Sequence, residues 1–319
     1  MLAWRLVPKL QTSPHRFDVL GVILSAVALF LIVFGLQEGE KFDWGVIWGP
    51  ISVWSLIITG LVVLGLFIVQ QARTRSEALV PLALFRDRNF SGANVAIAAV
   101  GFTVTSMSLP MMFFLQTARG LTPTEAALLL IPMAVLSGVL APFAGKLLDR
   151  VDPRIILIPG LLCVVVALVW YSTLINMGTD IWMFLLPSAL MGIGNAGMWG
   201  PLATTATRKL PPRQAGAGAG IYNTTRTIGS VIGSASIATF MQSRLEANLP
   251  GLADAPSGIS GGGSLPPEVA EGFAAGMSQA ILLPACVMVV ALVASLFLGR
   301  YDRADAAASA PTEAPAPAA

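Results

Sequence analysis

Arg226 is the one full charge in the middle of a membrane-length apolar segment of this chain, the stretch AGAGAGIYNTTRTIGSVIGSASI over residues 215–237. An arginine at mid-bilayer costs from ~3 to more than 10 kcal/mol, so it normally faces a partner or a water-filled cavity. Snorkelling to an interface is the simpler alternative. Helical spacing places other residues on the same face: Tyr222, Asn223, Gly229, Ser230 and Gly233. Two glycine pairs permit close helix contact: Gly216 with Gly220, and Gly229 with Gly233.

Two further groups of residues could line a cavity for small molecules. Soft and aromatic side chains, which suit varied apolar ligands, cluster around Pro110: Met107, Met111, Met112, Phe113 and Phe114, with Gln116 just beyond. Packing in the core or against lipid is the alternative for these. A second face, in the segment after residue 180, combines Ser188, Met191, Gly192, Asn195 and Trp199. Asn195 is either a cavity residue or an interhelical hydrogen-bonding residue.

A short polar loop, GKLLDRVDPR over residues 145–154, joins two apolar segments. Gly145 permits a tight approach of the backbone. Asp149 and Asp152 can cap the following helix, at its positive end. Arg150 and Arg154 can bridge to acids or carbonyls of a neighbouring helix. The alternative is an ordinary basic loop on the inner side of a membrane.

The composition of the chain indicates that these residues lie in segments that cross a membrane. The chain has 55% hydrophobic and only 11% charged residues, whereas a soluble domain has ~25% charged residues. We therefore predict an all-α polytopic membrane protein with eight transmembrane helices. The predicted spans are Val19–Leu36, Ile47–Gln70, Asn89–Gln116, Glu125–Leu147, Ile155–Ile175, Ile181–Ala206, Gln214–Met241 and Gly276–Gly299.

The charges of the loops predict the orientation, because Lys and Arg concentrate on the cytoplasmic side. The basic residues gather in alternate loops, and both ends of the chain are predicted to be cytoplasmic. Only Lys41, Arg119 and Arg244 fall in outer segments. This topology explains the basic residues without nucleic acid. The outer loop over residues 242–273 is rich in Gly, Pro and Ser and is expected to be flexible.

No enzymatic or metal chemistry is indicated within the spans. They hold no nucleophile–base pair, metal cluster or phosphate loop, and His15 lies in a basic linker. Cys163 and Cys286 are far apart and do not form a metal or redox pair. An enzyme is therefore the least favoured class, and no cofactor is expected.

The loop over residues 145–154 resembles the signature loop of the major facilitator superfamily, G-x-L-x-D-R-x-x-x-[RK], in its second copy. The match covers Gly145, Leu147, Asp149, Arg150 and Arg154. Other stretches resemble the fourteen-span drug:proton antiporter branch, from its seventh helix to its last: HRFDVLGVILSAVALFLIVFGLQEG, LVPLALFRDRNF, LPMMFFLQTARGLTPTEAALLLIPMAV and GAGIYNTTRTIGSVIG.

The resemblance implies a rocker-switch exporter of a bacterial inner membrane, in which protons enter as drug leaves. Residues 1–18 would end a preceding helix and form a linker, residues 19–88 would hold two inserted helices, residues 89–299 the carboxy-terminal six-helix half, and residues 300–319 a disordered cytoplasmic tail. Asn195, Tyr222, Asn223 and Arg226 would line the central cavity. The signature loop would act as a cytoplasmic gate, with Asp149 and Arg150 in its charge network.

The chain departs from that branch in one respect, since no acidic residue falls within a predicted span. We expect the proton-binding acids on a missing amino-terminal six-helix half. The other expected partners are the lipid bilayer and small amphipathic or apolar substrates, with a proton gradient as the energy source. Two alternatives stay open: a dedicated single-compound exporter of the same superfamily, and a truncated non-transporting membrane protein.

Overall fold

The computed structural model describes residues 18–39, 42, 44–73, 80–208, 210, 214–249 and 266–299. The chain forms two compact units that divide between Ala83 and Leu84. The predicted helix end and linker before residue 18, and the predicted tail over residues 300–319, lie outside the described residues. The cytoplasmic placement of the two chain ends therefore stays a prediction.

The first unit is a pair of packed helices, α2 (Val19–Glu38) and α3 (Val53–Arg73). Asp18 caps α2 by accepting a hydrogen bond from the backbone N–H of Gly21 at 2.8 Å. The Gln71 amide donates to the same carboxylate at 2.7 Å and so connects the end of α3 to the start of α2. Small residues let the two backbones approach, since a Cβ at Gly60 would lie 2.7 Å from Ile32.

The predicted second span began too early. Instead of a helix from Ile47, the chain forms a short antiparallel hairpin of β1 (Val46–Trp48) and β2 (Ile51–Ser52) before α3 begins at Val53. Gly49 turns this hairpin with φ of 54°, a conformation open to glycine, and Pro50 follows it without a backbone donor. The Gly-Pro pair thus ends the apolar run as a turn.

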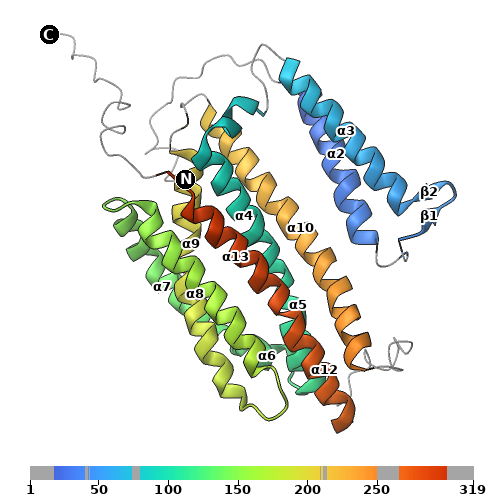
Figure 1. The fold of residues 1–319 in the computed structure, drawn as a ribbon, viewed down its shortest axis with the longest axis vertical. Helices are drawn as coiled ribbons and strands as arrows, with labels where there is room; N and C mark the ends of the chain where they lie inside the picture. The colour runs from blue at the N-terminus through green and yellow to red at the C-terminus, as the bar shows by residue number, and fades with distance from the viewer. Residues whose placement is uncertain are drawn as a thin grey trace, which may run out of the picture. The chain divides into compact units, whose positions relative to one another are not determined.

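The second unit is helical. Its elements, after the 3-10 turn η1 (Leu82–Arg86), are α4 (Arg88–Ser106), α5 (Ser108–Phe113), the π-helical turn η2 (Phe114–Ala118), α6 (Pro123–Leu128), α7 (Ile131–Leu148), α8 (Pro153–Leu174), η3 (Ile181–Phe184), α9 (Leu185–Thr207), α10 (Ala215–Asn248), α12 (Pro267–Ala280) and α13 (Leu282–Leu296). Figure 1 shows α4 between α10 and α13, and α8 beside α9.

Seven helical segments in the described part of the chain are long and apolar enough to cross a membrane. They confirm an all-α polytopic membrane protein. The eighth predicted span is also a helix, α10, whose 34 residues correspond to ~51 Å. It does not count among the seven because glycine, serine, threonine and Arg226 make it less apolar.

The ends of two helices differ from the prediction. Helix α10 continues past Met241 to Asn248, and α12 begins at Pro267 rather than near Gly276. The connection between these helices is therefore shorter than the flexible outer loop predicted over residues 242–273, and its residues 250–265 lie outside the described part. Before α6, Thr122 and Glu125 have the sequence pattern of a capping box, and the structure shows that capping box at the start of the helix.

Glycines set how closely the helices of the second unit approach. A Cβ at Gly233 would lie 2.6 Å from the Phe102 carbonyl oxygen of α4, and one at Gly229 would collide with the Ala98 carbonyl. This pair confirms the predicted close contact. The other predicted pair is wrong within the described residues, because a Cβ at Gly216 or Gly220 would meet nothing within 4 Å.

Candidate functional site

Arg226 lies in the fourth turn of α10, about 17 Å along the helix from its start, and its side chain is exposed. The guanidinium carbon lies 5.9 Å from the centre of the Trp199 ring on α9. This is within the range of a cation–π interaction, which contributes ~0.5–1 kcal/mol at an exposed site. Because α9 and α10 also pack against each other, the two side chains belong to one surface.

The polar neighbours of Arg226 form hydrogen bonds within their own helix. The Asn223 amide donates to the Ala219 carbonyl at 3.0 Å, and the Thr227 hydroxyl donates to the Asn223 carbonyl at 3.0 Å. Both side chains are exposed. Among the described residues, the guanidinium of Arg226 has the ring of Trp199 as its contact and no hydrogen bond. Its five N–H donors are therefore free to bind an acceptor from outside these residues.

The face predicted around Arg226 divides into two. Gly229 and Gly233 turn toward α4, and the Ser230 hydroxyl donates to the Gly101 carbonyl of α4 at 3.2 Å. Arg226 and Asn223 lie on the exposed side instead. The helix thus uses its small residues for packing and leaves its charged and amide side chains for a surface.

Tyr222, which is predicted to line the central cavity, lies on the packed side of α10 in the structure. Its side chain is only 7% exposed, and its hydroxyl has no hydrogen-bond partner among the described residues. Asn94 of α4 is 4% exposed, and its carbonyl oxygen likewise has no partner. The Asn94 amide nitrogen donates to the Phe90 carbonyl of its own helix at 2.8 Å. Two buried polar atoms without partners are thus present in the packed helices α10 and α4.

Asn195 is half-buried on α9, one turn before the half-buried Trp199. The structure thus places it near the same surface as Arg226. Other members of its predicted face are buried, and Ser188 among them accepts a hydrogen bond from the backbone N–H of Met133 at 3.3 Å. Sequence reasoning placed Trp199 on this face but missed its contact with Arg226. A periodic pattern within one helix could not show which helix lies next to it.

Met111 and Phe114 are core residues, which corrects their assignment to a substrate cavity. They are 2% and 0% exposed. The Phe114 ring lies 5.9 Å from the ring of Phe184, which lies 6.2 Å from that of Tyr171. The packing alternative therefore holds for both. Gln116 is half-buried in η2, and its amide lies 3.8 Å from the sulfur of Met112.

The loop over residues 145–154 is a tight connection between α7 and α8. Asp152 caps α8, as predicted, by accepting a hydrogen bond from the Arg154 N–H at 3.0 Å. Asp149 follows the last residue of α7 and donates its backbone N–H to the Gly145 carbonyl. The close backbone approach that Gly145 would permit does not occur among the described residues, since a Cβ there would meet nothing within 4 Å.

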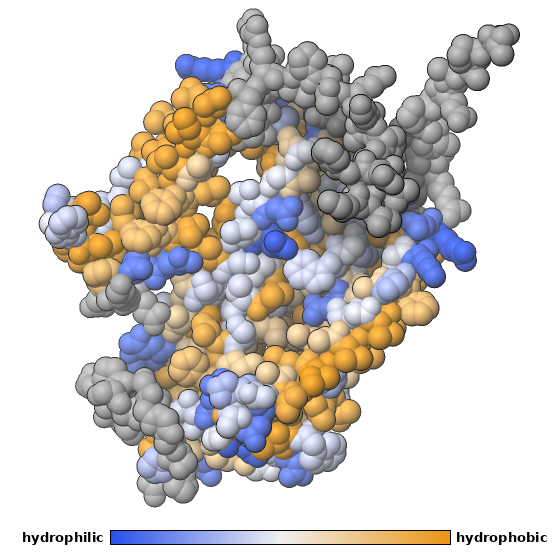
Figure 2. Space-filling model, turned by 180° about the vertical axis from the view of Figure 1, so that it is seen from behind, coloured by the Kyte–Doolittle hydropathy of each residue, from blue (hydrophilic) through white to orange (hydrophobic). Residues whose placement is uncertain are grey.

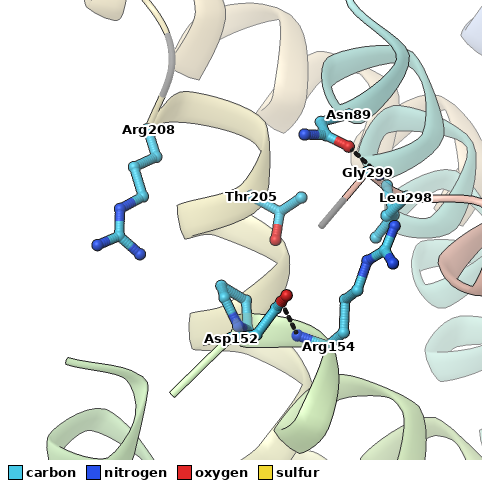
Figure 3. A pocket seen from close by; sticks show the side chains of 8 residues that line it. Asn89, Asp152, Arg154, Thr205, Arg208, Leu298 and Gly299 are labelled. Atoms are coloured by element: carbon cyan, nitrogen blue, oxygen red, sulfur yellow. Dashed lines mark hydrogen bonds between the residues drawn. The ribbon is translucent and has the colours of Figure 1, made fainter. Parts of the chain in front are cut away.

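Arg154 lines a small pocket at the ends of four helices, shown in Figure 3. Its guanidinium extends toward Leu298 and Gly299, while Asn89 from α4 bonds the Gly299 N–H. Two of its nitrogens, Nε and Nη2, are buried and have no hydrogen-bond partner within the part of the chain that the structure describes. The cavity volume of ≈ 30 Å³ holds roughly two water molecules, so the pocket suits a packed, hydrated junction better than a substrate.

This pocket gathers helix ends that the loop charges place on the same side of the membrane. The start of α4, the start of α8, the end of α9 and the residues after α13 meet there. At the opposite end of α8, a hollow of ≈ 550 Å³ between α8 and α12 is lined by residues that include Ser172, Asn176 and Glu271. Arg119 donates to the Met177 carbonyl at 2.8 Å beside it. The helices thus alternate in direction.

The apolar helices of the described part, with Asn195 on α9 and Asn223 and Arg226 on α10 at or near one surface, are those of a polytopic membrane protein. The chain belongs to the Major Facilitator Superfamily, which matches residues 17–234. The match includes α2, α3 and the helices that carry Asn195 and Arg226. The signature loop, read from the sequence as a family motif, lies inside it.

The relatives include transporters with and without an assigned compound. An uncharacterized MFS-type transporter of Mycobacterium tuberculosis is 44% identical over 311 residues, which are 96% of this chain and 53% of that protein. The lincomycin resistance protein of Listeria monocytogenes is 28% identical over 287 residues, 90% of this chain and 58% of the relative. The tetracenomycin C resistance and export protein of Streptomyces glaucescens is 28% identical over 339 residues, 97% and 61% of the two chains.

The fold agrees with that of a solved transporter. A bacterial homolog to the human lysosomal transporter Spinster, in an inward-facing and unoccupied conformation, superposes with a TM-score of 0.54 at 15% sequence identity. The alignment covers 88% of this chain and 70% of that one. At this identity the likeness concerns the fold. The chain spans between about half and three-fifths of the length of the curated relatives above.

Proposed function

We propose that this chain is the carboxy-terminal part of a proton-coupled multidrug efflux transporter that works by alternating access. The observation that carries the proposal is the exposed surface of Arg226 and Asn223 on α10, beside Trp199 on α9. A full charge at this depth of a helix needs water or a partner. An aqueous cavity between two halves of a transporter supplies both, and an isolated membrane anchor supplies neither.

Three groups of residues have distinct roles in this proposal. Arg226, Asn223 and Asn195 form part of the cavity wall that substrates meet. Residues 145–154, with Asp149, Arg150 and Arg154, form the cytoplasmic gate, and the small pocket at Arg154 is where four helix ends pack together. Gly229 and Gly233 hold α10 against α4, so that the wall is fixed while its open side faces the cavity.

The remaining components of the transporter lie outside this wall. An amino-terminal six-helix half supplies the opposite wall and the acids that bind the coupling proton. The protein lies in a bacterial inner membrane, with both ends of this chain in the cytoplasm. Its substrates are small amphipathic or apolar molecules. The names of two relatives, which refer to lincomycin resistance and to tetracenomycin C export, support a drug-export role.

A dedicated exporter for a single compound is the second candidate. It is favoured by the relative that is named for tetracenomycin C and aligns with most of this chain. Broad and narrow exporters differ in the number of unrelated molecules that they move, not in the family to which they belong. The distinction therefore needs a transport measurement.

The test is efflux by the complete gene product in bacterial cells that are loaded with chemically unrelated dyes. We expect at least three dyes to leave faster than from cells with an empty vector, and a protonophore to abolish the difference. Efflux of one compound alone would replace the multidrug proposal with the dedicated exporter. Equal retention with and without the protein, at verified membrane levels, would favour a non-transporting membrane protein.

A further inference from the structure

The charge balance around Arg226 restricts the kind of molecule that its surface can bind. The described helices next to it, α4 and α9, contain no acidic residue. The acid of α10 is Glu246, which lies 20 residues further along the helix, a distance of ~30 Å. Within the described residues, therefore, nothing on this surface neutralises the guanidinium.

An uncompensated guanidinium attracts anions and repels cations. Two unit charges 4 Å apart interact by ~1 kcal/mol in water and ~4 kcal/mol near a protein surface. A planar guanidinium also matches a carboxylate with two parallel hydrogen bonds, which adds geometric specificity. The side chains of Asn223 and Thr227 donate to backbone carbonyls within α10. Arg226 is therefore the side chain of this surface that is available to pair with a carboxylate.

Trp199 adds an aromatic surface to the charge. Its ring is half-buried, so that part of the indole still reaches the surface beside the guanidinium. Aromatic rings pair with other rings in offset or edge-to-face arrangements, worth ~0.5–1.5 kcal/mol beyond the area that they bury. Hydrophilic side chains reach the surface among apolar ones in the middle of the face seen in Figure 2.

We propose that Arg226 and Trp199 form a binding site for amphipathic aromatic anions. The acid group of the ligand pairs with the guanidinium of Arg226, and its planar ring lies against the exposed edge of Trp199. The inference rests on the proposed transport function and names the substrate class for this wall of the cavity. At this site aromatic carboxylates should bind better than aromatic cations. A surface without Arg226 would bind both equally well.

The test uses two xanthene dyes of similar shape and opposite charge, the carboxylate fluorescein and the cation rhodamine 6G. Binding to the purified complete protein in lipid nanodiscs is measured by fluorescence anisotropy. Efflux of each dye from cells is measured in parallel. We expect fluorescein to bind, Arg226→Gln to weaken that binding by ~10-fold or more, and Arg226→Lys to keep most of it, because Lys retains the charge but loses the bidentate geometry.

Arg226→Glu is expected to reverse the preference, so that fluorescein binding is lost and rhodamine 6G binding rises. Trp199→Leu should weaken fluorescein binding while the preference for the anion persists. Thr239→Ala is the matched control, because Thr239 is exposed on the same helix and its hydroxyl donates to the Ala235 carbonyl of its own helix. This variant should bind both dyes as the natural protein does.

Two results would overturn the proposed site. One is fluorescein binding that Arg226→Gln leaves unchanged. The other is an equal loss of both dyes in Arg226→Gln, which would make Arg226 a counter-ion for an acid elsewhere in the protein. The site and the transport function fail separately. Fluorescein binding without efflux of any dye would support the site and refute the transport function. Efflux of rhodamine 6G without fluorescein binding would support the transport function and refute the site.

Discussion

Replacing Gly233 by alanine should push α10 away from α4 and so disturb the helix packing that positions Arg226. The added Cβ would lie 2.6 Å from the Phe102 carbonyl oxygen and 2.8 Å from the Phe102 Cα. Ordinary contacts begin at 3.4 Å, so the backbones must move apart by about 0.8 Å. Neither atom belongs to a flexible side chain that could turn away.

The cost of this separation can be worked from the structure. Overpacking of a well-packed interface costs ~1–3 kcal/mol. The interface between α10 and α4 also contains two interhelical hydrogen bonds. The Thr105 hydroxyl donates to the Ser230 carbonyl at 2.9 Å, and the Ser230 hydroxyl donates to the Gly101 carbonyl at 3.2 Å. Each such bond contributes ~0.6 kcal/mol in a membrane protein. Gly233→Ala should therefore destabilise the protein by ~2–4 kcal/mol.

Gly220→Ala is the matched control on the same helix. Its added Cβ meets nothing within 4 Å, and alanine favours a helix over glycine by ~1 kcal/mol. The assay is the fraction of detergent-solubilised protein that stays monodisperse after heating. We expect a lower apparent Tm for Gly233→Ala and an unchanged or higher one for Gly220→Ala. Equal apparent Tm values for the two variants would refute the packing argument.

Three further changes test other parts of the structure by the same heating assay. Asp152→Ala removes the cap of α8 and should cost ~1 kcal/mol, whereas Asp152→Asn should retain most of the stability; no difference between them would contradict capping. Phe114→Ala should cost ~3–5 kcal/mol, since the ring is fully buried, and a loss below 1 kcal/mol would place the ring outside the core. Tyr222→Phe removes a buried hydroxyl that has no partner among the described residues, so stability should stay the same or rise, and a marked drop would show that the hydroxyl has a partner elsewhere.

Local signals in the sequence predicted local structure correctly. Asp152 caps α8 as predicted, and Thr122 and Glu125 form the capping box that their spacing favours, because these signals act within a few residues. The apolar runs likewise became helices. The hairpin before α3 was missed because apolar residues on both sides of Gly49 and Pro50 concealed the turn.

The direction of side chains could not be predicted from one helix alone. Both glycine pairs of α10 have the same spacing, yet only the pair at Gly229 and Gly233 meets a neighbouring backbone. Met111 and Phe114 suit a ligand as well as a core, and only their burial in the folded structure, with Phe114 beside Phe184, decides for the core. The contact of Arg226 with Trp199 joins two helices, so no periodicity within either helix could reveal it.

The central claim, that the surface of Arg226 and Asn223 faces a water-filled cavity, is tested most directly by thiol accessibility in the membrane. Cysteines are introduced singly at Asn223 and at Val290, an apolar position of α13 that is 51% exposed, after Cys163 and Cys286 are replaced by serine. The account predicts that a charged, membrane-impermeant methanethiosulfonate labels position 223 and not position 290, and that fluorescein slows the labelling. Protection of position 223 from this reagent in the membrane, while the same reagent labels it after denaturation in detergent, would contradict it.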